Sequence, residues 1–264
     1  MIDKSAILKR VTKIEDKLLI SKLLDKAEKA EYINNSVFSH FLDPYQRSVI
    51  EKALAGTKNL NYAFSGGYNG AERVIIIFGP NFIFQDDDII DELPLKVIRV
   101  EVLSRESLTH RDYLGAFMSL GIKREKIGDI LVGEETCDII VLSDIAEYIA
   151  FNLDRIGKAK IMISVKEVDS INTPDSKTKE IKASVASLRL DCVASAGFGI
   201  SRSKILELIK ADRVNLNWDT ANTPTKQVKE GDTISIRGKG RLVMESVGSI
   251  TRKDRIRILL KKYI

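Results

Sequence analysis

Near the start of the chain, apolar residues recur at the spacing of a helix. Separated by lysines and acidic residues, they stand at Ile14, Leu18, Leu19 and Leu23. A second helix is predicted at about 45–55, because Pro44 suits a first helical turn and Gly56 suits a stop. Residues 1–72 are therefore expected to form an N-terminal domain that is mainly helical or mixed.

After residue 72, short apolar runs typical of strands alternate with helical patterns. The strands are predicted at 74–78, 97–102, 129–132, 137–142 and 159–165. One helix is predicted from an N-cap at Thr109, supported by Asp112, to Leu120, and another from a cap at Ser143 to Leu153. From the strand at 97–102 onward, the β-α-β-β-α-β order is the ferredoxin-like arrangement of RNA-recognition (RRM) domains. Residues 73–168 are therefore expected to form an RRM-like RNA-binding domain.

The remaining sequence predicts a linker followed by a small α+β domain. Residues 169–181 lie in a polar stretch that contains Pro174 and lacks apolar periodicity, so they are expected to be the linker. In residues 182–264, one short helix should open at Arg189-Leu190-Asp191 and end at Gly197, and a second should open after Ser201. Strands are predicted at 214–217 and after the turn at Gly231-Asp232. The chain is thus expected to be a multidomain α+β protein.

Charge separates the last third of the chain from the rest. The whole sequence contains 42 Lys and Arg residues against 37 Asp and Glu residues, a formal net charge of +5. From Lys182 onward there are 17 basic and 8 acidic residues, so this part carries +9 and the remainder carries −4. Such asymmetry points to a polyanionic partner for the basic part.

Composition excludes several other classes of protein. The N-terminus has charges throughout and lacks the apolar core of a signal peptide, and the most apolar stretch, at 74–84, is too short to span a bilayer. Cys137 and Cys192 lie far apart, and His40 and His110 are the two histidines, so no structural zinc site is expected. The sequence predicts a reduced, cytoplasmic protein with no metal, organic cofactor, small-molecule substrate or membrane partner.

The basic part resembles the S4 domain, a compact RNA-binding fold. The resemblance rests on the run SLRLDCVASAGFGISRSKILELIKADRVNLNW, residues 187–218, followed by VKEGDTISIRGKGR. Several motif positions match in the right order. The resemblance implies that residues 182–264 are an S4 domain that binds structured RNA.

Motifs upstream extend this resemblance to a family. The chain is similar to the YlmH family at the segments 41–44 (FLDP), 66–73 (GGYNGAER), 110–116 (HRDYLGA), 121–130 (GIKREKIGDI) and 237–241 (RGKGR), and at Trp218. The resemblance implies a bacterial RNA-binding protein with a helical or mixed N-terminal part, an RRM-like middle domain and a C-terminal S4 domain. It also implies a ribosome-associated factor linked to peptidyl-tRNA on obstructed large subunits. Some members carry a cell-division label.

Enzyme-like motifs do not form a recognisable catalytic set. The triplet His110-Arg111-Asp112 copies a kinase signature, but Phe117 stands where that signature needs Asn, so a helix start is favoured. The Gly67–Gly70 spacing resembles a KH-type clamp, and a structural turn is favoured there. Asp191 is expected to pair within the module and to orient Arg189. The protein is predicted to be non-catalytic; the alternatives are an RNA-modifying enzyme with a site around the triplet, or a cell-division scaffold.

The second helix of the basic module is the predicted centre of RNA binding. Arg202 and Lys204 stand in its first turn, where the helix dipole disfavours cations by about 0.3–1 kcal/mol each. A phosphate bound at the capped helix N-terminus would explain that placement, although long cations lying along the surface remain an alternative. The full set of predicted RNA-binding residues is Arg189, Ser201, Arg202, Ser203, Lys204, Lys210, Arg213, Asn217, Arg237, Lys239 and Arg241.

Three further expectations concern the surroundings of this set. Residues 251–257 are predicted to form a strand with one charged face. Trp218 fits base stacking and packing equally well. The strand at 97–102 lacks the aromatic residues with which RRM domains stack bases, so the middle domain is expected to bind protein or RNA backbone. The predicted partner is ribosomal RNA or tRNA, on the large ribosomal subunit.

Overall fold

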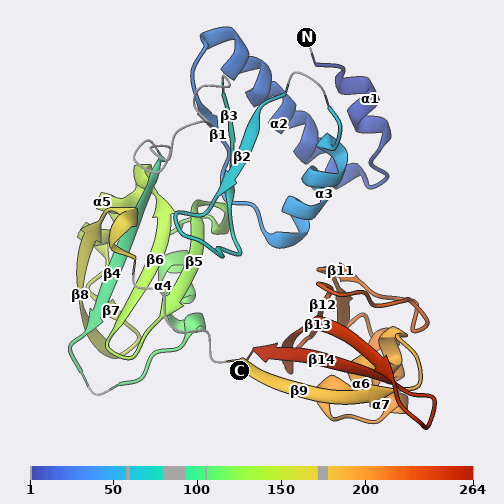
Figure 1. The fold of residues 1–264 in the computed structure, drawn as a ribbon. Coiled ribbons are helices and arrows are strands. Elements are labelled where there is room, and N and C mark those ends of the chain that lie inside the picture. Colours follow the sequence, from blue (N-terminus) through green and yellow to red (C-terminus); the bar gives the residue numbers. More distant parts are fainter. Residues whose placement is uncertain (1, 58–59, 80–92, 105, 172–177, 264) are drawn as a thin grey trace. The chain divides into compact units, whose positions relative to one another are not determined.

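The computed structural model describes residues 2–57, 60–79, 93–104, 106–171 and 178–263. The chain forms two compact units, Met1–Pro174 and Asp175–Ile264 (Figure 1). Within these described residues, the first unit contains two sheets and the second contains one. Among the described helices, none is long and apolar enough to cross a membrane.

The N-terminal part of the first unit is mixed, with helices packed on a small sheet. Its elements are α1 (Lys4–Lys9), α2 (Ile14–Ile33), β1 (Val37–Phe38), α3 (Pro44–Leu54), β2 (Tyr62–Ser65) and β3 (Ile75–Phe78). The predicted helix at 45–55 is confirmed, because Asp43 and Gln46 form a capping box around Pro44. Ile76 and Phe78 of β3 are buried with the apolar faces of α2 and α3.

Strand β3 corrects the predicted division between the first two domains. The sequence placed residues 74–78 in the middle domain, but the strand order in the structure is β1-β3-β2, so β3 is the centre of the N-terminal sheet. All four residues of β3 are buried. An apolar run of this kind shows that a strand is covered on both faces and does not show which strands pair with it.

The middle part of the first unit has the predicted ferredoxin-like topology. Its elements are β4 (Leu95–Val102), α4 (His110–Ser119), β5 (Ile127–Val132), β6 (Thr136–Leu142), α5 (Ala146–Asn152), β7 (Arg155–Ile156) and β8 (Ala159–Lys166). The strand order is β5-β6-β4-β8-β7, with every pair antiparallel. The Thr109–Asp112 capping box is confirmed. Ser143 instead begins a 3₁₀ helix, Ser143–Ile145, and α5 starts after it.

The two faces of this middle sheet are covered differently. Helices α4 and α5 pack on one face, where Ile98, Val100 and Ile139 are buried. On the other face, Leu95 and Ile140 are buried in a cluster that also contains Ile75 and Ile77 of β3. Part of the sheet face with which RRM domains contact RNA is therefore covered by the chain's own N-terminal sheet.

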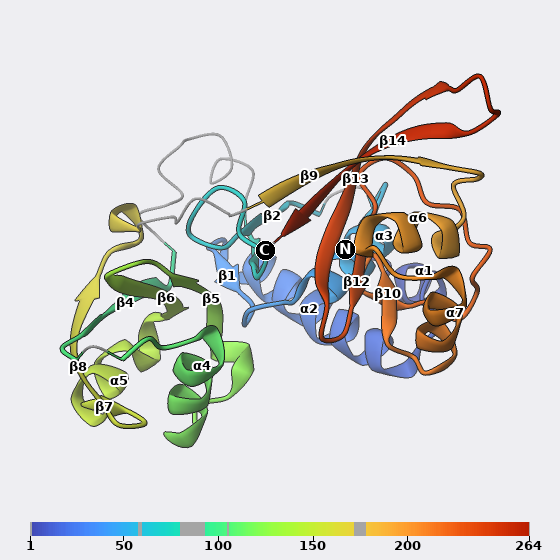
Figure 2. The same cartoon turned by 90° about the horizontal axis from the view of Figure 1, so that it is seen from below.

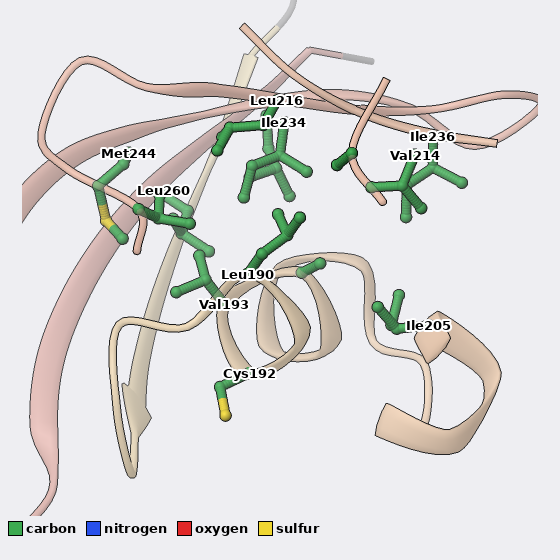
Figure 3. Close-up of a cluster of buried hydrophobic side chains, with 14 of the residues drawn as sticks. Leu190, Cys192, Val193, Ile205, Val214, Leu216, Ile234, Ile236, Met244 and Leu260 are labelled. Carbon is green, nitrogen blue, oxygen red and sulfur yellow. The ribbon is translucent and has the colours of Figure 1, made fainter. Parts of the chain in front are cut away.

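The second unit places two helices against one face of a six-stranded sheet (Figures 1 and 2). Its elements are β9 (Thr178–Val185), α6 (Leu190–Phe198), α7 (Arg202–Lys210), β10 (Val214–Leu216), β11 (Asp219–Thr220), β12 (Thr233–Ile236), β13 (Gly240–Ile250) and β14 (Ile256–Tyr263). The strand order is β11-β10-β12-β13-β14-β9. Leu190, Val193 and Ile205 from the helices meet Leu216, Ile234 and Leu260 from the sheet (Figure 3).

Strand β9 shortens the predicted linker. It begins at Thr178 and pairs with β14 along its whole length, from Thr178 opposite Tyr263 to Val185 opposite Ile256. Residues 178–181 thus belong to the sheet, while residues 172–177 of the predicted linker lie outside the described residues. Apolar residues alternate with polar residues along β9, and Ile181, Ala183 and Val185 face the core. The lysines in this segment made the alternation hard to recognise in the sequence.

Two further predictions for this unit are wrong. The predicted strand at 251–257 is mostly the turn between β13 and β14. Gly197 does not end α6; it lies inside the helix, which ends at Gly199 in the left-handed conformation. A Cβ on Gly197 would lie 2.4 Å from Cδ2 of Leu242 and 2.8 Å from Cδ1 of Leu260, so glycine permits the helix to touch the sheet.

Replacing Gly197 with alanine is therefore expected to destabilise the second unit by about 1–3 kcal/mol, because Leu242 and Leu260 are fully buried and have no room to move. Gly115 is the matched control: it also lies inside a helix, and a Cβ there meets open space. Gly115→Ala should be neutral or stabilising by up to about 1 kcal/mol. Denaturant unfolding of both variants checks this expectation, and an unchanged midpoint for Gly197→Ala would contradict the close packing.

Candidate RNA interface

The start of α7 has the predicted geometry. The Ser201 side chain accepts a hydrogen bond from the backbone N–H of Lys204 at 3.3 Å, which makes Ser201 the N-cap. Ile205, Leu208 and Ile209 are buried in the core. The residues of the first turn, Arg202, Ser203 and Lys204, are exposed. An anion could therefore reach both the helix N-terminus and the side chains around it.

Two arginines converge on a buried carboxylate beside this helix start. Asp191, in the first turn of α6, is 1% exposed. Its oxygens accept hydrogen bonds from Nη2 of Arg202 at 2.5 Å and from Nε of Arg189 at 3.1 Å. The expected pairing of Asp191 with Arg189 is confirmed, and Arg202 joins it. The group keeps a net positive charge, because one carboxylate is shared by two guanidinium groups.

Arg202 and Lys204 form ion pairs within the domain, which the sequence analysis did not predict. The side chain of Arg202 is 54% exposed although one of its nitrogens contacts Asp191. Lys204 forms an exposed pair with Glu207, with 2.6 Å between Nζ and the carboxylate oxygen. Exposed pairs of this kind are weak and can be exchanged for another anion. Arg202 also keeps guanidinium donors beyond the one that meets Asp191.

The pKa of Asp191 reflects two opposing influences. Burial raises it, but the hydrogen bonds from Arg202 and Arg189 outweigh burial, so the pKa lies below its ordinary value. A carboxyl group with a lowered pKa in the folded state stabilises the fold above the pKa of the unfolded chain, which is about 4. That stabilisation is lost as the pH falls through the lower pKa of the folded state.

Replacing Asp191 with asparagine is expected to destabilise the second unit at neutral pH by about 2 kcal/mol, the usual value of hydrogen bonds to charged groups. The variant should also lose less of its remaining stability than the parent between pH 5 and pH 2 (roughly the range in which a paired carboxylate titrates). Unfolding midpoints across that range check both effects. Glu207→Gln, which removes an exposed pair, is the control. A variant with the acid dependence of the parent would contradict the assignment.

The other predicted residues lie in different places. Lys210 ends α7, at the opposite end of the helix from Ser201. Arg213 donates a hydrogen bond to the carbonyl oxygen of Arg237 at 3.1 Å, so Arg213, Arg237 and Lys239 gather at the exposed turn between β12 and β13.

Asn217 is engaged within the domain. Its Nδ2 donates to a carboxylate oxygen of Asp232 at 2.7 Å, and its Oδ1 accepts from the backbone N–H of Thr233 at 2.8 Å. The residue has a φ of 52°, a conformation that asparagine tolerates better than most residues do. These contacts make Asn217 a turn residue, and its contact with RNA stays a prediction.

Arg241 lies on strand β13 rather than in a loop with Arg237 and Lys239. Its guanidinium carbon is 4.0 Å from the centroid of the Tyr263 ring on β14. The predicted set is therefore divided among the helix starts, the end of α7, the turn between β10 and β11, the β12–β13 turn and a sheet face. Sequence reasoning missed that Lys182, Arg257 and Lys261 share that face, because strand pairing between β9 and β14 brings them together.

Several motif residues of the first unit hold its two sheets together. The carboxylate of Asp129 accepts hydrogen bonds from the Tyr68 hydroxyl at 2.8 Å and from the backbone N–H groups of Glu72 and Arg73 at 2.7 and 3.1 Å. The Arg73 guanidinium donates to the carbonyl oxygens of Phe41, Arg124 and Ile127. The motifs at 41–44, 66–73 and 121–130 thus meet in one hydrogen-bonded junction.

The triplet His110-Arg111-Asp112 forms the start of α4, as the helix reading predicted. Asp112 accepts hydrogen bonds from the hydroxyl and the backbone N–H of Thr109, both at 2.7 Å, and these bonds lower its pKa. Its carboxylate is therefore occupied in capping the helix. In the part of the chain that the structure describes, no three Cys, His, Asp or Glu side chains are grouped as a metal site.

Comparison with known proteins agrees with this architecture. Residues 15–83 match the family model "YlmH, N-terminal", residues 94–170 match "Putative RNA-binding domain in YlmH", and residues 188–234 match the S4 domain. The ribosome-associated protein quality control protein P2 of Bacillus subtilis (strain 168) is 35% identical over 223 residues, which are 84% of this chain and 85% of that protein.

A solved structure shares the fold of part of the chain. The cell division protein ylmH from Streptococcus pneumoniae has a TM-score of 0.51 and 21% identity, and the match covers 61% of this chain and 98% of that one. At this identity the likeness concerns the fold. The two YlmH models, the S4 match and the extended identity to the Bacillus protein together show that the chain belongs to the YlmH family.

Proposed function

We propose that this protein is a non-catalytic RNA-binding factor that acts on the ribosome in translation quality control. The observation that carries the proposal is the second unit: it matches the S4 domain, and residues 182–264 carry a net charge of +9. Its exposed helix start combines backbone N–H groups with Arg189, Arg202 and Lys204. Such a combination suits a phosphate of structured RNA.

The arrangement at α7 explains how a phosphate would be held. Ser201 occupies the N–H of Lys204, which leaves earlier N–H groups of the first turn free to donate to an anion. Arg202 is fixed in direction by Asp191 and still presents exposed donors to solvent. A phosphate oxygen would displace Glu207 from Lys204, since exposed ion pairs are weak. The contacts are to the RNA backbone, so the site recognises shape rather than sequence.

The similarity to the Bacillus quality control protein supports a ribosomal partner for this chain. We propose ribosomal RNA or tRNA on an obstructed large subunit as the ligand. Within the first unit, the partly covered sheet and the lack of aromatic residues on β4 favour contacts with protein or RNA backbone over base reading. The cell-division name belongs to the pneumococcal relative, and its likeness to this chain concerns the fold.

Sedimentation with purified ribosomal subunits tests the proposed partner. The chain should migrate with the large subunit at low salt and leave it as salt rises, because phosphate contacts weaken with ionic strength. Crosslinking in cells, followed by sequencing of the bound RNA, should recover large-subunit RNA or tRNA. Migration with the small subunit alone, or recovery of messenger RNA alone, would contradict the proposal.

Asp112→Ala is expected to leave RNA chemistry unchanged, because the carboxylate caps a helix. Mass spectrometry of ribosomal and transfer RNA from a deletion strain, complemented with wild type or the variant, measures this. A modification that is lost on deletion and restored by wild type, but not by Asp112→Ala, would establish the enzyme alternative.

A further inference from the structure

The sheet of the second unit has a face that the helices do not cover. Side chains alternate between the two faces of a strand. On β14, Ile258 and Leu260 are buried in the core with α6 and α7, so Arg257, Leu259, Lys261 and Tyr263 lie on the opposite face. The strand register adds Lys182 of β9 opposite Leu259, and Arg241 of β13 opposite Tyr263.

This outer face is strongly basic. We define the basic sheet face as Lys182, Arg241, Arg257 and Lys261, together with Tyr263. Glu180 shares the face opposite Lys261, and Glu245 is exposed at the irregularity between Met244 and Ser246 of β13. Among the residues that the structure describes, Lys182, Arg257 and Lys261 have no side-chain hydrogen bond or ion pair. Arg202 and Lys204 at α7, by contrast, both have an acidic partner.

Two features extend this face. The turn between β13 and β14 projects away from α6 and α7 (Figure 2) and carries the exposed cations Arg252 and Lys253. Arg255, in the same turn, donates hydrogen bonds to the side chain and the carbonyl oxygen of Ser184 on β9, which fixes the turn against the sheet edge. Arg257 and Lys261 lie four residues apart on one strand, or about 13 Å. A row of cations on a rigid sheet therefore leads from the turn toward the Tyr263 end.

Tyr263 adds an aromatic ring to this row of cations. The Arg241 guanidinium lies 4.0 Å from the centroid of the Tyr263 ring, and both side chains are half-buried. A guanidinium stacked on an aromatic ring is a flat, positively charged platform. Unpaired bases stack on such platforms, while phosphates contact cations around them. A rigid row of cations that ends at a stacking platform suits an unpaired nucleic-acid strand.

We propose that the basic sheet face is a second RNA-binding surface, which holds an unpaired RNA strand by its phosphates and stacks one base on the Arg241–Tyr263 pair. The proposal rests on the function proposed above and adds to it. Because this surface and the start of α7 lie on opposite sides of the sheet, the unit would contact RNA at two places. An RNA in which a single-stranded segment adjoins a double helix could occupy both binding surfaces.

The test is a salt titration of binding by the full chain, with a labelled 12-nucleotide uridine RNA and purified 23S ribosomal RNA as probes. The variant K182Q/R257Q/K261Q removes three unpartnered cations and keeps most of their length, so the fold should survive. It should bind the uridine RNA at least tenfold more weakly and with a log–log salt slope shallower by about two, at roughly 0.7 per lost contact. The matched control K17Q/K29Q/K52Q changes exposed lysines of the first unit and should behave like the parent.

Tyr263→Leu separates stacking from charge. It should weaken binding of the uridine RNA by about five- to a hundredfold, the usual effect of losing one stacked base, with an unchanged salt slope. If K182Q/R257Q/K261Q matches its control, or if the parent binds 23S RNA but not the uridine RNA, the second surface is wrong and the proposed function stands. If the parent binds neither RNA, both are wrong.

Discussion

Replacing Asp129 with alanine is expected to destabilise the Met1–Pro174 unit by about 3 kcal/mol. The carboxylate is the shared acceptor for the Tyr68 hydroxyl and for the backbone N–H groups of Glu72 and Arg73. Alanine would leave these donors without an acceptor at a partly buried junction, and each unsatisfied donor typically costs about 1–3 kcal/mol. Burial and the charge of Asp129 raise the pKa of Tyr68, so its hydroxyl stays a hydrogen-bond donor at neutral pH.

The two units can be observed separately in this experiment. Trp218 is the single tryptophan of the sequence and lies in the second unit, so its fluorescence reports on that unit. Far-ultraviolet circular dichroism reports on both units. Asp129→Ala should lower the unfolding midpoint measured by circular dichroism and leave the unfolding midpoint measured by Trp218 fluorescence unchanged. Asp129→Asn keeps one oxygen acceptor, so it should lower the first midpoint less. Equal midpoints for Asp129→Ala and the parent would show that the junction does not stabilise the unit.

Arg202→Ala is expected to weaken binding of structured RNA by about ten- to a hundredfold, because one charge-assisted contact to a phosphate is lost. The log–log salt slope should become shallower by nearly one. From the sequence, the variant would also gain slightly in stability, since a cation leaves the positive end of a helix. The ion pair with Asp191 reverses that expectation, and we expect a small loss of stability, limited by the exposure of Arg202 and by the remaining Arg189.

RNA affinity at several salt concentrations, measured beside thermal unfolding, separates the two effects. Arg155→Ala is the control, because Arg155 is an exposed arginine of the first unit. A binding loss much larger than the stability loss, with a shallower slope, is the expected result. Lost stability with unchanged affinity and slope would make Arg202 a structural residue and would place the phosphate site elsewhere.

Local sequence patterns predicted the elements that local forces determine. The capped start of α4 at Thr109 and the buried face of α7 follow from residues three to four positions apart, and both are confirmed. The partners of β3 and β9 could not be predicted in this way. Strand β3 pairs with the neighbouring β2 and with the more distant β1, and β9 pairs with β14, 71 to 85 residues away along the chain. Register of that kind depends on tertiary packing.

The same limit applies to the candidate interface. The helix start at Ser201 was predicted, because a cap and its first turn are adjacent in sequence. The contact between Asp191 and Arg202 spans 11 residues and two helices, and neither periodicity nor charge counting indicates it. The separation of Arg241 from Arg237 follows from the strand that begins at Gly240, and it was hidden because the glycines suggested one continuous loop.

The central claim is that the second unit binds RNA through its basic surfaces, and the salt dependence of RNA affinity tests it most directly. Binding of 23S ribosomal RNA should be measured for the full chain and for the separate segments Met1–Pro174 and Asp175–Ile264. If about five phosphates are neutralised, the full chain and the second segment should share a log–log slope of roughly −3 to −5. An affinity independent of salt, or one retained entirely by Met1–Pro174, would contradict this account.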